Sequence, residues 1–391
     1  MPKIAIFMNS LAGGGMERGM LNLAKFFAKE GAGVDLLVAS AKGPLIAEVP
    51  ESINLIDLKS SKYKTKSIRL WLIKAFFTVE PWLLVLFFTK KLPKAIKSIP
   101  AVIEYMNVVA PDVILSTPTT ANLAVVWAKF YCEPNSKIVI REASTLSQEI
   151  QNKNTLFFKL TKKFVKKWYN HADSVICVSK DVSDDLKENF LIDKSKLNVI
   201  YNILDAEMIK SKALSSEYNS IIDGYGKYIL SAGRLEKQKD YETLIYAYHL
   251  VAKKSSVNLV IIGEGPERAK LEALREALHL TDRVHIPGFF VNPYPFIQNC
   301  EVFALSSRWE GCPNVMRESM LLGKKIISTD CAGVKEILDE SASRVLSPVG
   351  EYEAYAKKLL DLIELREENL DVDADSIIKR SKELYYNLMV G

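Results

Sequence analysis

The stretch EVFALSSRWEGCPNVMRESM, residues 301–320, contains an apolar run, a polar loop and the start of a helix. The apolar letters EVFAL predict a buried strand. Proline is poorly tolerated inside a helix but suits its first position, so Pro313 predicts the helix start. Glu310 then lies in the loop before the helix, and Glu318 lies about a turn and a half inside it. The two carboxylates are therefore not an acid/base pair on one helix.

Strands and helices alternate along the rest of the chain. Apolar runs lie near helical patterns in the first half (KIAIFM, GVDLLVAS, DVILST, KIVIREAS, SVICVS) and again in the second (YILSAGRL, NLVIIGEG, RVHIPGF, KKIISTD). This alternation predicts parallel sheets with helices on both faces, and the two blocks predict an α/β fold of two Rossmann-like, doubly wound domains. Ligands bind at the carboxyl ends of such strands, so we expect the site in a central cleft between the domains.

A chain of 391 residues is too long for one ordinary core, which also predicts two domains. We place them at 1–205 and 206–370, followed by a C-terminal helix over 371–391 that can cross back to the first domain. The five cysteines form no CxxC pair and no metal-binding spacing, which fits reduced thiols in a cytoplasm. The apolar N-terminus lacks a basic region and a cleavage site, so it predicts a first strand rather than a signal peptide. No apolar run approaches the roughly 18–20 residues of a spanning helix.

Two further segments carry groups suited to an anion. The turn SAGRLEKQKD presents Arg234 and Lys239 after a strand. A guanidinium makes bidentate contacts with phosphate oxygens, and an ammonium acts as a point charge. Such a basic run is, on its own, more commonly a solvated loop. The amides of Asn314 and Val315, in the first turn of the helix after Glu310, shift the balance toward phosphate binding.

A glycine-rich turn, NSLAGGGMER, follows the first strand and opens the first helix. Its glycines permit close backbone approach, and the helix N-terminus offers amides to an anion. The pattern does not fit a dinucleotide site, because the spacing is not GxGxxG and the second strand is followed by Lys42 rather than by an acid. A plain tight turn is the alternative; backbone access favours a ligand near Gly14 and Gly15.

Positive charge is concentrated in residues 59–97. This window holds ten Lys/Arg and one acid, a charge of +9, whereas the whole chain carries +5. Its aromatic and aliphatic groups with flanking cations predict an element in the plane of an anionic membrane surface, where each basic residue adds about 1 kcal/mol. A core helix pair with a solvated basic face is the alternative, and it leaves the charge excess unexplained.

A second basic segment, FKLTKKFVKKWY, places five lysines on one helix face. A solvated face is again the alternative, but together the two segments favour membrane docking. The residues assigned to the membrane are Lys62, Lys64, Lys66, Arg69, Trp71, Trp82, Lys163 and Lys167.

Several motifs together resemble one known family. EGCPNVMRE is similar to the E-x7-E motif of the retaining family-4 glycosyltransferases, which have the GT-B fold. GGGMERGMLNLAKFFAKEG resembles the Gly-rich opening of that family, ADSVICVS and VIYNILD the end of its N-terminal domain, and GRLEKQKDYETLI its phosphate-binding turn. IIGEGPERAKLE and ESMLLGKKIISTDCAGVKEIL also fit, so the resemblance covers most of the chain and is strongest over 228–338. It implies an acceptor-binding domain at 1–205 and a nucleotide-sugar-binding domain at 206–370.

The resemblance implies roles for individual residues. Glu310 would hold hydroxyls of the donor sugar, and Glu318 the ribose hydroxyls. Arg234 and Lys239 would neutralise the diphosphate, and with Glu310 they form the expected catalytic set. Departure of a nucleoside diphosphate builds negative charge on the β-phosphate, which preorganised cations and amides stabilise. The expected donor-binding set is Gly14, Gly15, Arg234, Lys239, Asn314, Val315 and Glu318.

One departure from the family concerns the loop after KIVIREAS, where many relatives place a histidine. Here the loop offers Arg141, Glu142 and Ser144, and none of the four histidines lies in it. We expect Arg141, Glu142 and Glu17 to contact donor or acceptor. The family implies a retaining mechanism without a covalent nucleophile, in which the leaving phosphate helps to deprotonate the acceptor; the identity of any base stays open.

The sequence thus predicts a retaining glycosyltransferase that moves a sugar from a nucleotide-sugar donor, with UDP favoured, to a lipid-linked glycan acceptor. We expect it to be cytoplasmic, peripheral on the inner face of the membrane, and to use no metal or other cofactor. A nucleotide-sugar epimerase would need further carboxylates and histidine at the reacting carbon. A nucleic-acid-binding module would need stacking aromatics on a recognisable binding fold, so no nucleic-acid partner is expected. The donor sugar, the linkage and the oligomeric state stay open.

Overall fold

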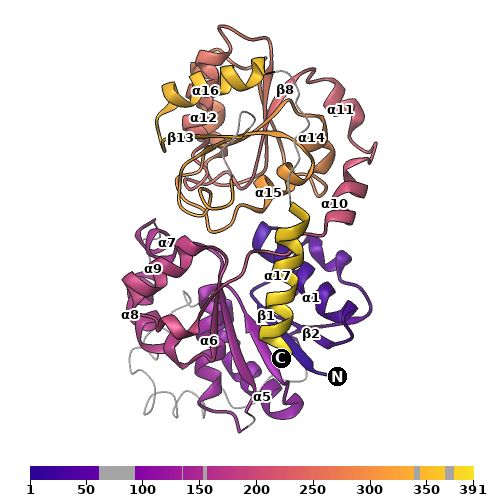
Figure 1. Cartoon of the computed structure of the whole chain (residues 1–391), viewed down its shortest axis with the longest axis vertical. Coiled ribbons are helices and arrows are strands. Elements are labelled where there is room, and N and C mark those ends of the chain that lie inside the picture. The colour runs from indigo at the N-terminus through magenta and orange to yellow at the C-terminus, as the bar shows by residue number, and fades with distance from the viewer. Residues whose placement is uncertain (61–92, 134, 153–155, 339–343, 366–373) are drawn as a thin grey trace. The chain divides into compact units, whose positions relative to one another are not determined.

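The computed structural model describes residues 1–60, 93–133, 135–152, 156–338, 344–365 and 374–391. The chain divides into two compact units, the first formed by Met1–Ile203 with Ser381–Gly391 and the second by Leu204–Arg380 (Figure 1). The sequence places a domain boundary two residues later, between 205 and 206. The last helix, α17 (Ala374–Met389), contributes residues to both units.

Within the described part of the first unit, seven parallel strands form one sheet in the order β3-β2-β1-β4-β5-β6-β7. The strands are β1 (Lys3–Met8), β2 (Gly33–Val38), β3 (Ile53–Asp57), β4 (Val113–Ser116), β5 (Lys137–Glu142), β6 (Ser174–Cys177) and β7 (Leu197–Val199). The helices are α1 (Gly15–Lys29), α4 (Lys94–Lys97), α5 (Ile99–Val109), α6 (Thr119–Lys129), α7 (Leu146–Asn152), α8 (Leu156–Trp168) and α9 (Lys180–Phe190), with short 3-10 turns η1 (Pro44–Glu48), η2 (Tyr169–His171) and η3 (Lys194–Lys196).

The described part of the second unit has a parallel sheet of six strands in the order β10-β9-β8-β11-β12-β13. The strands are β8 (Tyr228–Ala232), β9 (Asn258–Ile262), β10 (Val284–Gly288), β11 (Val302–Leu305), β12 (Lys325–Thr329) and β13 (Arg344–Ser347). The helices are α10 (Ala206–Ala213), α11 (Asn219–Asp223), α12 (Tyr241–Val251), α13 (Arg268–Ala277), α14 (Tyr294–Asn299), α15 (Asn314–Leu321) and α16 (Tyr352–Glu364). The prediction of two doubly wound parallel-sheet blocks is confirmed.

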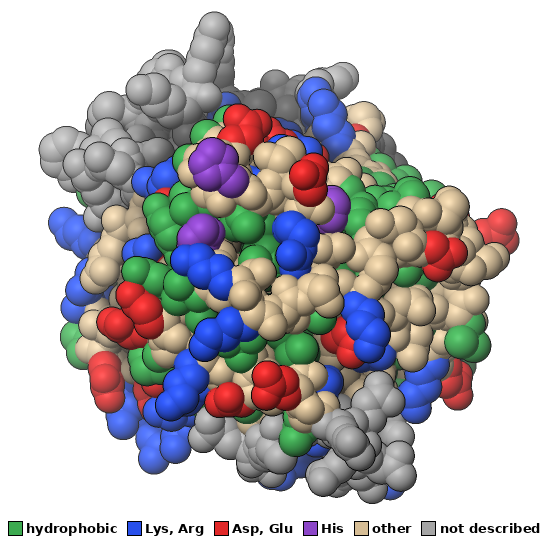
Figure 2. All heavy atoms as spheres, turned by 90° about the horizontal axis from the view of Figure 1, so that it is seen from above, with side chains coloured by type: hydrophobic (Ala, Val, Ile, Leu, Met, Phe, Trp, Pro, Cys, Tyr) green, Lys and Arg blue, Asp and Glu red, His purple; other side chains and the backbone are tan. Residues whose placement is uncertain are grey.

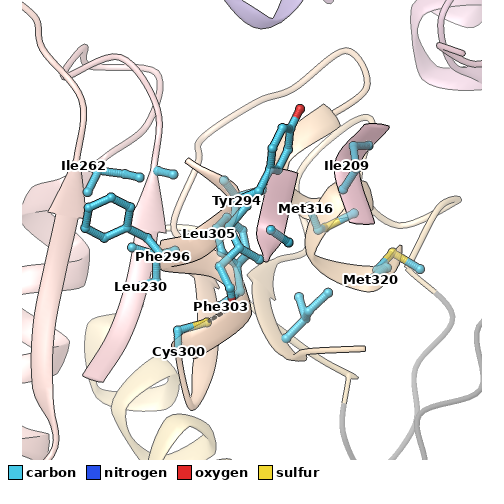
Figure 3. Packing of buried hydrophobic residues seen from close by; sticks show 14 of the residues in the cluster. Ile209, Leu230, Ile262, Tyr294, Phe296, Cys300, Phe303, Leu305, Met316 and Met320 are labelled. Atoms are coloured by element: carbon cyan, nitrogen blue, oxygen red, sulfur yellow. Dashed lines mark hydrogen bonds between the residues drawn. The ribbon is translucent and has the colours of Figure 1, made fainter. Parts of the chain in front are cut away.

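The central strands are buried on both faces, and successive side chains serve different cores because the side-chain period of a strand is two. In β8, Leu230 packs into the core beneath α14, whereas its neighbour Ile229 packs into the opposite core with α12 and α16. Figure 3 shows the first of these cores, where Tyr294 and Phe296 of α14 lie near Leu230 and Phe303. Continuous apolar runs such as LVII and VFAL follow from this two-sided burial.

Strands β3, β7 and β13 are absent from the sequence prediction, and each lies at an edge of its sheet. An edge strand needs less apolar surface than a central one. In β3 the buried residue is Ile53, and the strand β7 has no buried residue. The sequence signal that identifies central strands is therefore weak in these three.

The strand orders contain one reversal in each sheet. In the first unit the chain runs outward through β2 and β3 on one side of β1 and then continues with β4 on the other side. In the second unit the same reversal lies between β8 and β11. Ligands of doubly wound sheets bind outside the carboxyl ends of the strands at such a switch point. A ligand site is therefore expected at the loops after β1, β4, β8 and β11.

Candidate functional site

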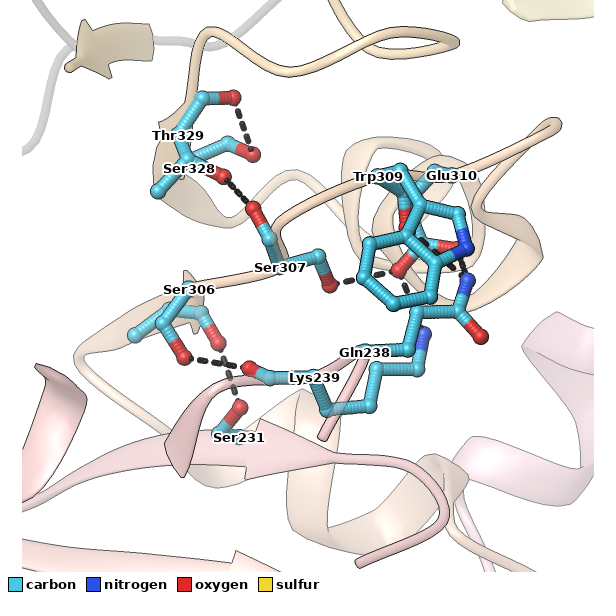
Figure 4. Close-up of polar contacts among 10 residues, drawn as sticks. Ser231, Gln238, Lys239, Ser306, Ser307, Trp309, Glu310, Ser328 and Thr329 are labelled. Atoms are coloured by element: carbon cyan, nitrogen blue, oxygen red, sulfur yellow. Dashed lines mark hydrogen bonds and ion pairs between the residues drawn. The ribbon is translucent and has the colours of Figure 1, made fainter. Parts of the chain in front are cut away.

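The β8/β11 switch point of the second unit joins two loops that carry charge. The loop after β8 contains Lys239, and the loop after β11 contains Glu310. Lys239 Nζ lies 2.6 Å from Glu310 Oε1, and the side chains are 15% and 7% exposed (Figure 4). A pair so shielded from water interacts more strongly than a surface pair, and each partner stabilises the charge of the other. The structure thus brings together two of the three residues assigned to catalysis.

Neutral groups hold both loops in place. Ser307 Oγ donates a hydrogen bond of 2.5 Å to Glu310 Oε1, and Ser306 Oγ donates one of 2.8 Å to the carbonyl oxygen of Lys239. Gln238 Nε2 donates to the Trp309 carbonyl at 2.8 Å and lies 3.5 Å from Glu310 Oε2. Figure 4 shows Ser307 and Gln238 beside the Glu310 carboxylate and Ser306 beside the backbone of Lys239. The loops after two strands far apart in sequence are therefore cross-linked at the point where their charges meet.

The third assigned residue, Arg234, behaves differently. Its side chain is 71% exposed and pairs with Glu236 at 2.5 Å. Gly233, just before it, gives Lys239 its room, because a Cβ there would lie 3.1 Å from Lys239 Cε. Arg234 is thus available at the surface of the same loop, whereas Lys239 is enclosed.

Helix α15 begins at Asn314, with Pro313 as its N-cap, so the predicted start at Pro313 is one residue too early. The proline ring fits this position because its backbone angles are extended (φ −71°, ψ 93°). The first-turn positions Asn314 and Val315 stand at the N-terminus of this helix, whose dipole favours an anion. Glu318, on the fifth residue of the helix, is 7% exposed.

Glu310 and Glu318 thus occupy different elements. Glu310 precedes the helix, and its own amide donates to the Ala332 carbonyl at 3.0 Å. The Tyr294 hydroxyl of α14 lies 3.5 Å from Glu318 Oε1. The carboxylates have separate surroundings, which is consistent with separate tasks.

In the first unit, the glycine-rich turn leads from β1 into α1. Gly14 is the N-cap of α1, and Gly15 is the first helical residue. A Cβ on Gly14 would lie 2.5 Å from Glu17 Oε2, so Glu17 folds back over this turn. The close approach of a ligand to this turn stays a prediction.

The structure surrounds Arg141 with partners inside the first unit, although it was expected to contact a substrate. It is 2% exposed, its Nε donates to the Tyr385 hydroxyl of α17 at 3.3 Å, and its NH2 group donates to Asn202. Tyr385 itself is buried in the core of that unit. The guanidinium therefore ties the end of β5 to the last helix.

Glu142 is also 2% exposed and lies in a hydrogen-bonded network at the ends of β4 and β5. It accepts from Thr119 Oγ1 at 3.1 Å, from Asn122 Nδ2 at 2.9 Å and from the Tyr169 hydroxyl. Burial raises the pKa of Glu142 from 4.5 to about 7, and the hydrogen bonds from Tyr169 and Asn122 act in the opposite direction. These partners give Glu142 a role in fixing the loop after β5 and the start of α6.

Helix α8 carries the second lysine segment. Lys162, Lys163, Lys166 and Lys167 are exposed, while Phe164, Val165 and Trp168 are buried. Phe164 and Trp168 pack edge-on against Trp127 of α6, with ring centroids 5.8 and 6.2 Å apart. The prediction of a one-sided basic helix is confirmed for these four lysines. Lys62, Lys64, Lys66, Arg69, Trp71 and Trp82 lie outside the described residues.

Charge is not segregated everywhere on the molecule. On the face in Figure 2, Lys/Arg and Asp/Glu side chains are interspersed, in contrast to the lysine row of α8. Among the residues that the structure describes, no group of three His, Cys, Asp or Glu could hold a metal ion. Within the same residues, no helix is both long enough and apolar enough to cross a membrane.

The sequence did not reveal the roles of several neutral residues. Ser306, Ser307 and Gln238 support the charged pair, and two hydroxyls directly after an apolar strand were the available signal. Asn122 and Tyr169 hold Glu142; a single asparagine within the apolar helix stretch TTANLAVVWAK was the signal for a buried polar partner.

Comparison with known proteins agrees with this architecture. The family described as Glycosyltransferase Family 4 matches residues 13–208, and the one described as Glycosyl transferases group 1 matches residues 219–378. A Campylobacter jejuni protein is 30% identical over 366 residues, which are 93% of this chain and 91% of the relative. The chain belongs to glycosyltransferase family 4. This glycosyltransferase has the GT-B fold.

The C. jejuni relative is named N-acetylgalactosamine-N,N'-diacetylbacillosaminyl-diphospho-undecaprenol 4-alpha-N-acetylgalactosaminyltransferase. The lipopolysaccharide core biosynthesis glycosyltransferase LpsD of Rhizobium meliloti is 27% identical over 184 residues, 47% of the glycosyltransferase and 51% of LpsD. The solved structure of HepE from Anabaena, in complex with UDP and glucose, aligns with a TM-score of 0.74 at 17% identity and covers all of both chains. At that identity the likeness to HepE concerns the fold.

Proposed function

We propose that this glycosyltransferase moves a sugar from a UDP-linked donor, with retention of anomeric configuration, to a lipid-linked glycan acceptor. The product would belong to a cell-surface polysaccharide, a lipopolysaccharide or a glycoprotein glycan. The observation that supports the donor half is the shielded Lys239–Glu310 pair at the β8/β11 switch point, beside the N-terminus of α15. A diphosphate needs fixed cations and amides, and a sugar hydroxyl needs a fixed carboxylate.

The donor residues divide this work as follows. Lys239 and the amides of Asn314 and Val315 receive the charge that builds on the β-phosphate as the bond to the sugar breaks. Arg234, which is 71% exposed, reaches the same diphosphate from the surface of its loop. Glu310 accepts hydrogen bonds from sugar hydroxyls. These groups meet the charge of the leaving diphosphate, so we propose that no metal ion takes part.

The remaining donor contacts involve the ribose and the first unit. Glu318 accepts from the ribose hydroxyls, since a buried carboxylate on a helix is a fixed double acceptor. Gly14 and Gly15 allow the backbone to pass close to the diphosphate. Glu17 lies over that turn and is the proposed polar contact for the acceptor.

The acceptor assignment is supported by the relatives. The name of the C. jejuni relative contains a diphospho-undecaprenol glycan, and that of the R. meliloti relative contains the lipopolysaccharide core. Such acceptors are held at a membrane, where a soluble donor and an anchored acceptor meet. A protein that serves them gains from lying on the membrane surface.

Helix α8 supplies a surface suited to an anionic leaflet, and we place the enzyme on the cytoplasmic face of the membrane. Four lysines are exposed on one helix, and each adds about 1 kcal/mol of attraction near such a surface. The double substitution Lys163→Glu/Lys167→Glu should weaken sedimentation with vesicles rich in phosphatidylglycerol. The control Lys187→Glu/Lys194→Glu makes the same charge change at exposed lysines elsewhere on the first unit. Equal binding by both variants would remove α8 from the proposal.

A donor screen tests the central claim. The protein is incubated with UDP-glucose, UDP-N-acetylglucosamine, UDP-N-acetylgalactosamine and GDP-mannose, and hydrolysis or transfer is followed by mass. Glu310→Ala should abolish transfer while the fold is retained, whereas the control Glu301→Ala, at an exposed ion pair before β11, should not. Near-normal turnover by Glu310→Ala would refute its role. Proton NMR of the first product reports the anomeric configuration, and an inverted product would refute retention.

A further inference from the structure

A fully buried serine stands next to the carboxylate of the donor site. Ser307 is the second residue after β11, and its exposed fraction is 0%. Its hydroxyl donates to Glu310 Oε1 at 2.5 Å, within the range of hydrogen bonds from a hydroxyl to an ionised carboxylate. Its own backbone is held in turn, because Thr329 Oγ1 of β12 donates to the Ser307 carbonyl oxygen (Figure 4). The donor of this hydrogen bond is therefore anchored to the neighbouring strand.

The same carboxylate oxygen also accepts the ion pair from Lys239, at 2.6 Å. A single ion pair fixes one atom of a glutamate but leaves the carboxylate plane able to turn, since the terminal torsion of glutamate has a broad energy profile. The Ser307 hydroxyl is a second hydrogen-bond donor to that oxygen. It approaches from the loop after β11, whereas Lys239 approaches from the loop after β8, so the two together restrict the rotation. Gln238 Nε2, 3.5 Å from Oε2, stands on the other side of the group.

Lys239 and Ser307 differ in how they respond when the nucleotide sugar binds. Under the proposed function, which this inference deepens and on which it rests, Lys239 is drawn to the diphosphate. Its hold on Glu310 then weakens at the step in which Glu310 must keep its orientation. Ser307 is neutral and buried, so a diphosphate exerts far less pull on it. The hydroxyl can hold the carboxylate while the lysine shares its charge with the leaving group.

We propose that Ser307 is a positioning residue that fixes the orientation of the Glu310 carboxylate toward the donor sugar during transfer. Ser306 complements it, because its hydroxyl donates to the Lys239 carbonyl at 2.8 Å and so fixes the loop of the cation. Adjacent residues of an extended segment point to opposite sides, which allows two consecutive serines to hold two different loops.

Three variants test the inference. Ser307→Ala removes the hydroxyl, Ser307→Cys keeps nearly the same shape with a weak donor, and Ser307→Thr restores a hydroxyl. Ser328→Ala is the matched control, because Ser328 is also 0% exposed, lies near the end of the adjacent strand β12, and donates to the Thr329 carbonyl at 3.1 Å instead of to Glu310. Each protein is assayed as the full chain with the nucleotide sugar that the wild type uses best.

Ser307→Ala should lower kcat by about 10- to 150-fold, the range for loss of one hydrogen bond to a charged group. Its Kd for UDP, measured by titration calorimetry, should stay within about two-fold of the wild type, because UDP lacks the sugar that Glu310 holds. Ser307→Thr should recover part of kcat, and Ser328→Ala should keep it. A role limited to folding would lower the thermal midpoint but leave kcat of the folded fraction unchanged.

The outcomes separate the two claims. If the wild type transfers or hydrolyses a nucleotide sugar and Ser307→Ala keeps more than half of kcat, the role of Ser307 is refuted and the proposed function stands. If the wild type binds no nucleoside diphosphate and turns over no nucleotide sugar, the proposed function fails and the inference falls with it. Should Ser307→Ala not fold, Ser307→Cys decides the matter, and wild-type kcat in that variant overturns the inference.

Discussion

Replacement of Glu142 by glutamine is expected to change the pH dependence of stability in a direction that can be worked out. Glu142 is buried and accepts hydrogen bonds from Thr119, Asn122 and Tyr169. Burial raises its pKa from 4.5 to about 7. Between these two values the folded protein holds a proton that the unfolded chain has released. Stability therefore falls as the pH rises from about 4.5 to about 7 and is constant, for this group, outside that window.

The size of the effect follows from the two pKa values. Over the whole window the free energy of unfolding falls by about 3 kcal/mol, and about 2.5 kcal/mol of this fall lies between pH 5 and pH 8. Glutamine has no proton to release, so Glu142→Gln lacks this term. Relative to the wild type, the variant should gain about 2.5 kcal/mol between pH 5 and pH 8. Other titrating groups, including the four histidines, are common to both proteins and cancel in the comparison.

Urea denaturation at pH 5, 6, 7 and 8 provides the measurement, followed by the fluorescence of Trp127 and Trp168, which are buried in the same unit. Tyr169→Phe serves as a second variant, because the Tyr169 hydrogen bond lowers the pKa of Glu142. Its loss should extend the fall in stability to higher pH. Stability curves of wild type and Glu142→Gln that run parallel from pH 5 to pH 8 would refute the reasoning.

Two further substitutions test contacts of the loop after β8. Lys239→Met leaves the carboxylate of Glu310, which is 7% exposed, without its cation. The free energy of unfolding, measured by urea titration, should fall by about 3–5 kcal/mol. Turnover, measured by hydrolysis of the nucleotide sugar, should fall by at least about 100-fold. Gly263→Ala would place a Cβ 1.9 Å from the Gly233 carbonyl oxygen, so the second unit should lose about 2–4 kcal/mol of stability. At Gly33 no atom of the described residues beyond its chain neighbours lies within 4 Å of an added Cβ, so Gly33→Ala should change stability by less than about 1 kcal/mol. A wild-type urea midpoint for Lys239→Met would contradict the role of the ion pair with Glu310, and a wild-type midpoint for Gly263→Ala would contradict the close contact with Gly233.

The sequence was most informative about the buried part of the fold. Central strands such as Val302–Leu305 are apolar throughout, because both faces are covered by helices. The edge strand Ile53–Asp57 has one buried residue, so its pattern does not differ clearly from that of a loop. The start of α15 was displaced by one residue, because proline suits both the N-cap geometry found here and the first helical position.

At the site, residue types could be predicted but partners could not. Lys239 and Glu310 are 71 positions apart, and they meet because β8 and β11 become neighbours in the sheet. Arg141 lies near the end of β5 and was expected to contact a substrate; its partner Tyr385 lies 244 positions away on the last helix. A linear pattern identifies a charged loop, whereas the choice between ligand and internal partner depends on which elements pack together.

In the proposed reaction, a general base must remove the proton of the acceptor hydroxyl. A general base must lie within hydrogen-bond reach of the proton it removes. Glu142 is an acid at the end of β5, but it is enclosed by three hydrogen-bond donors of its own unit. It suits the task of holding a loop. Under the proposed function, the departing phosphate, whose charge Lys239 offsets, then serves as the base. On this reasoning Glu142→Gln should keep kcat at pH 7.5 within a few-fold of the wild type while Glu310→Ala loses it, and a loss of kcat in Glu142→Gln as large as in Glu310→Ala would reassign the base to Glu142.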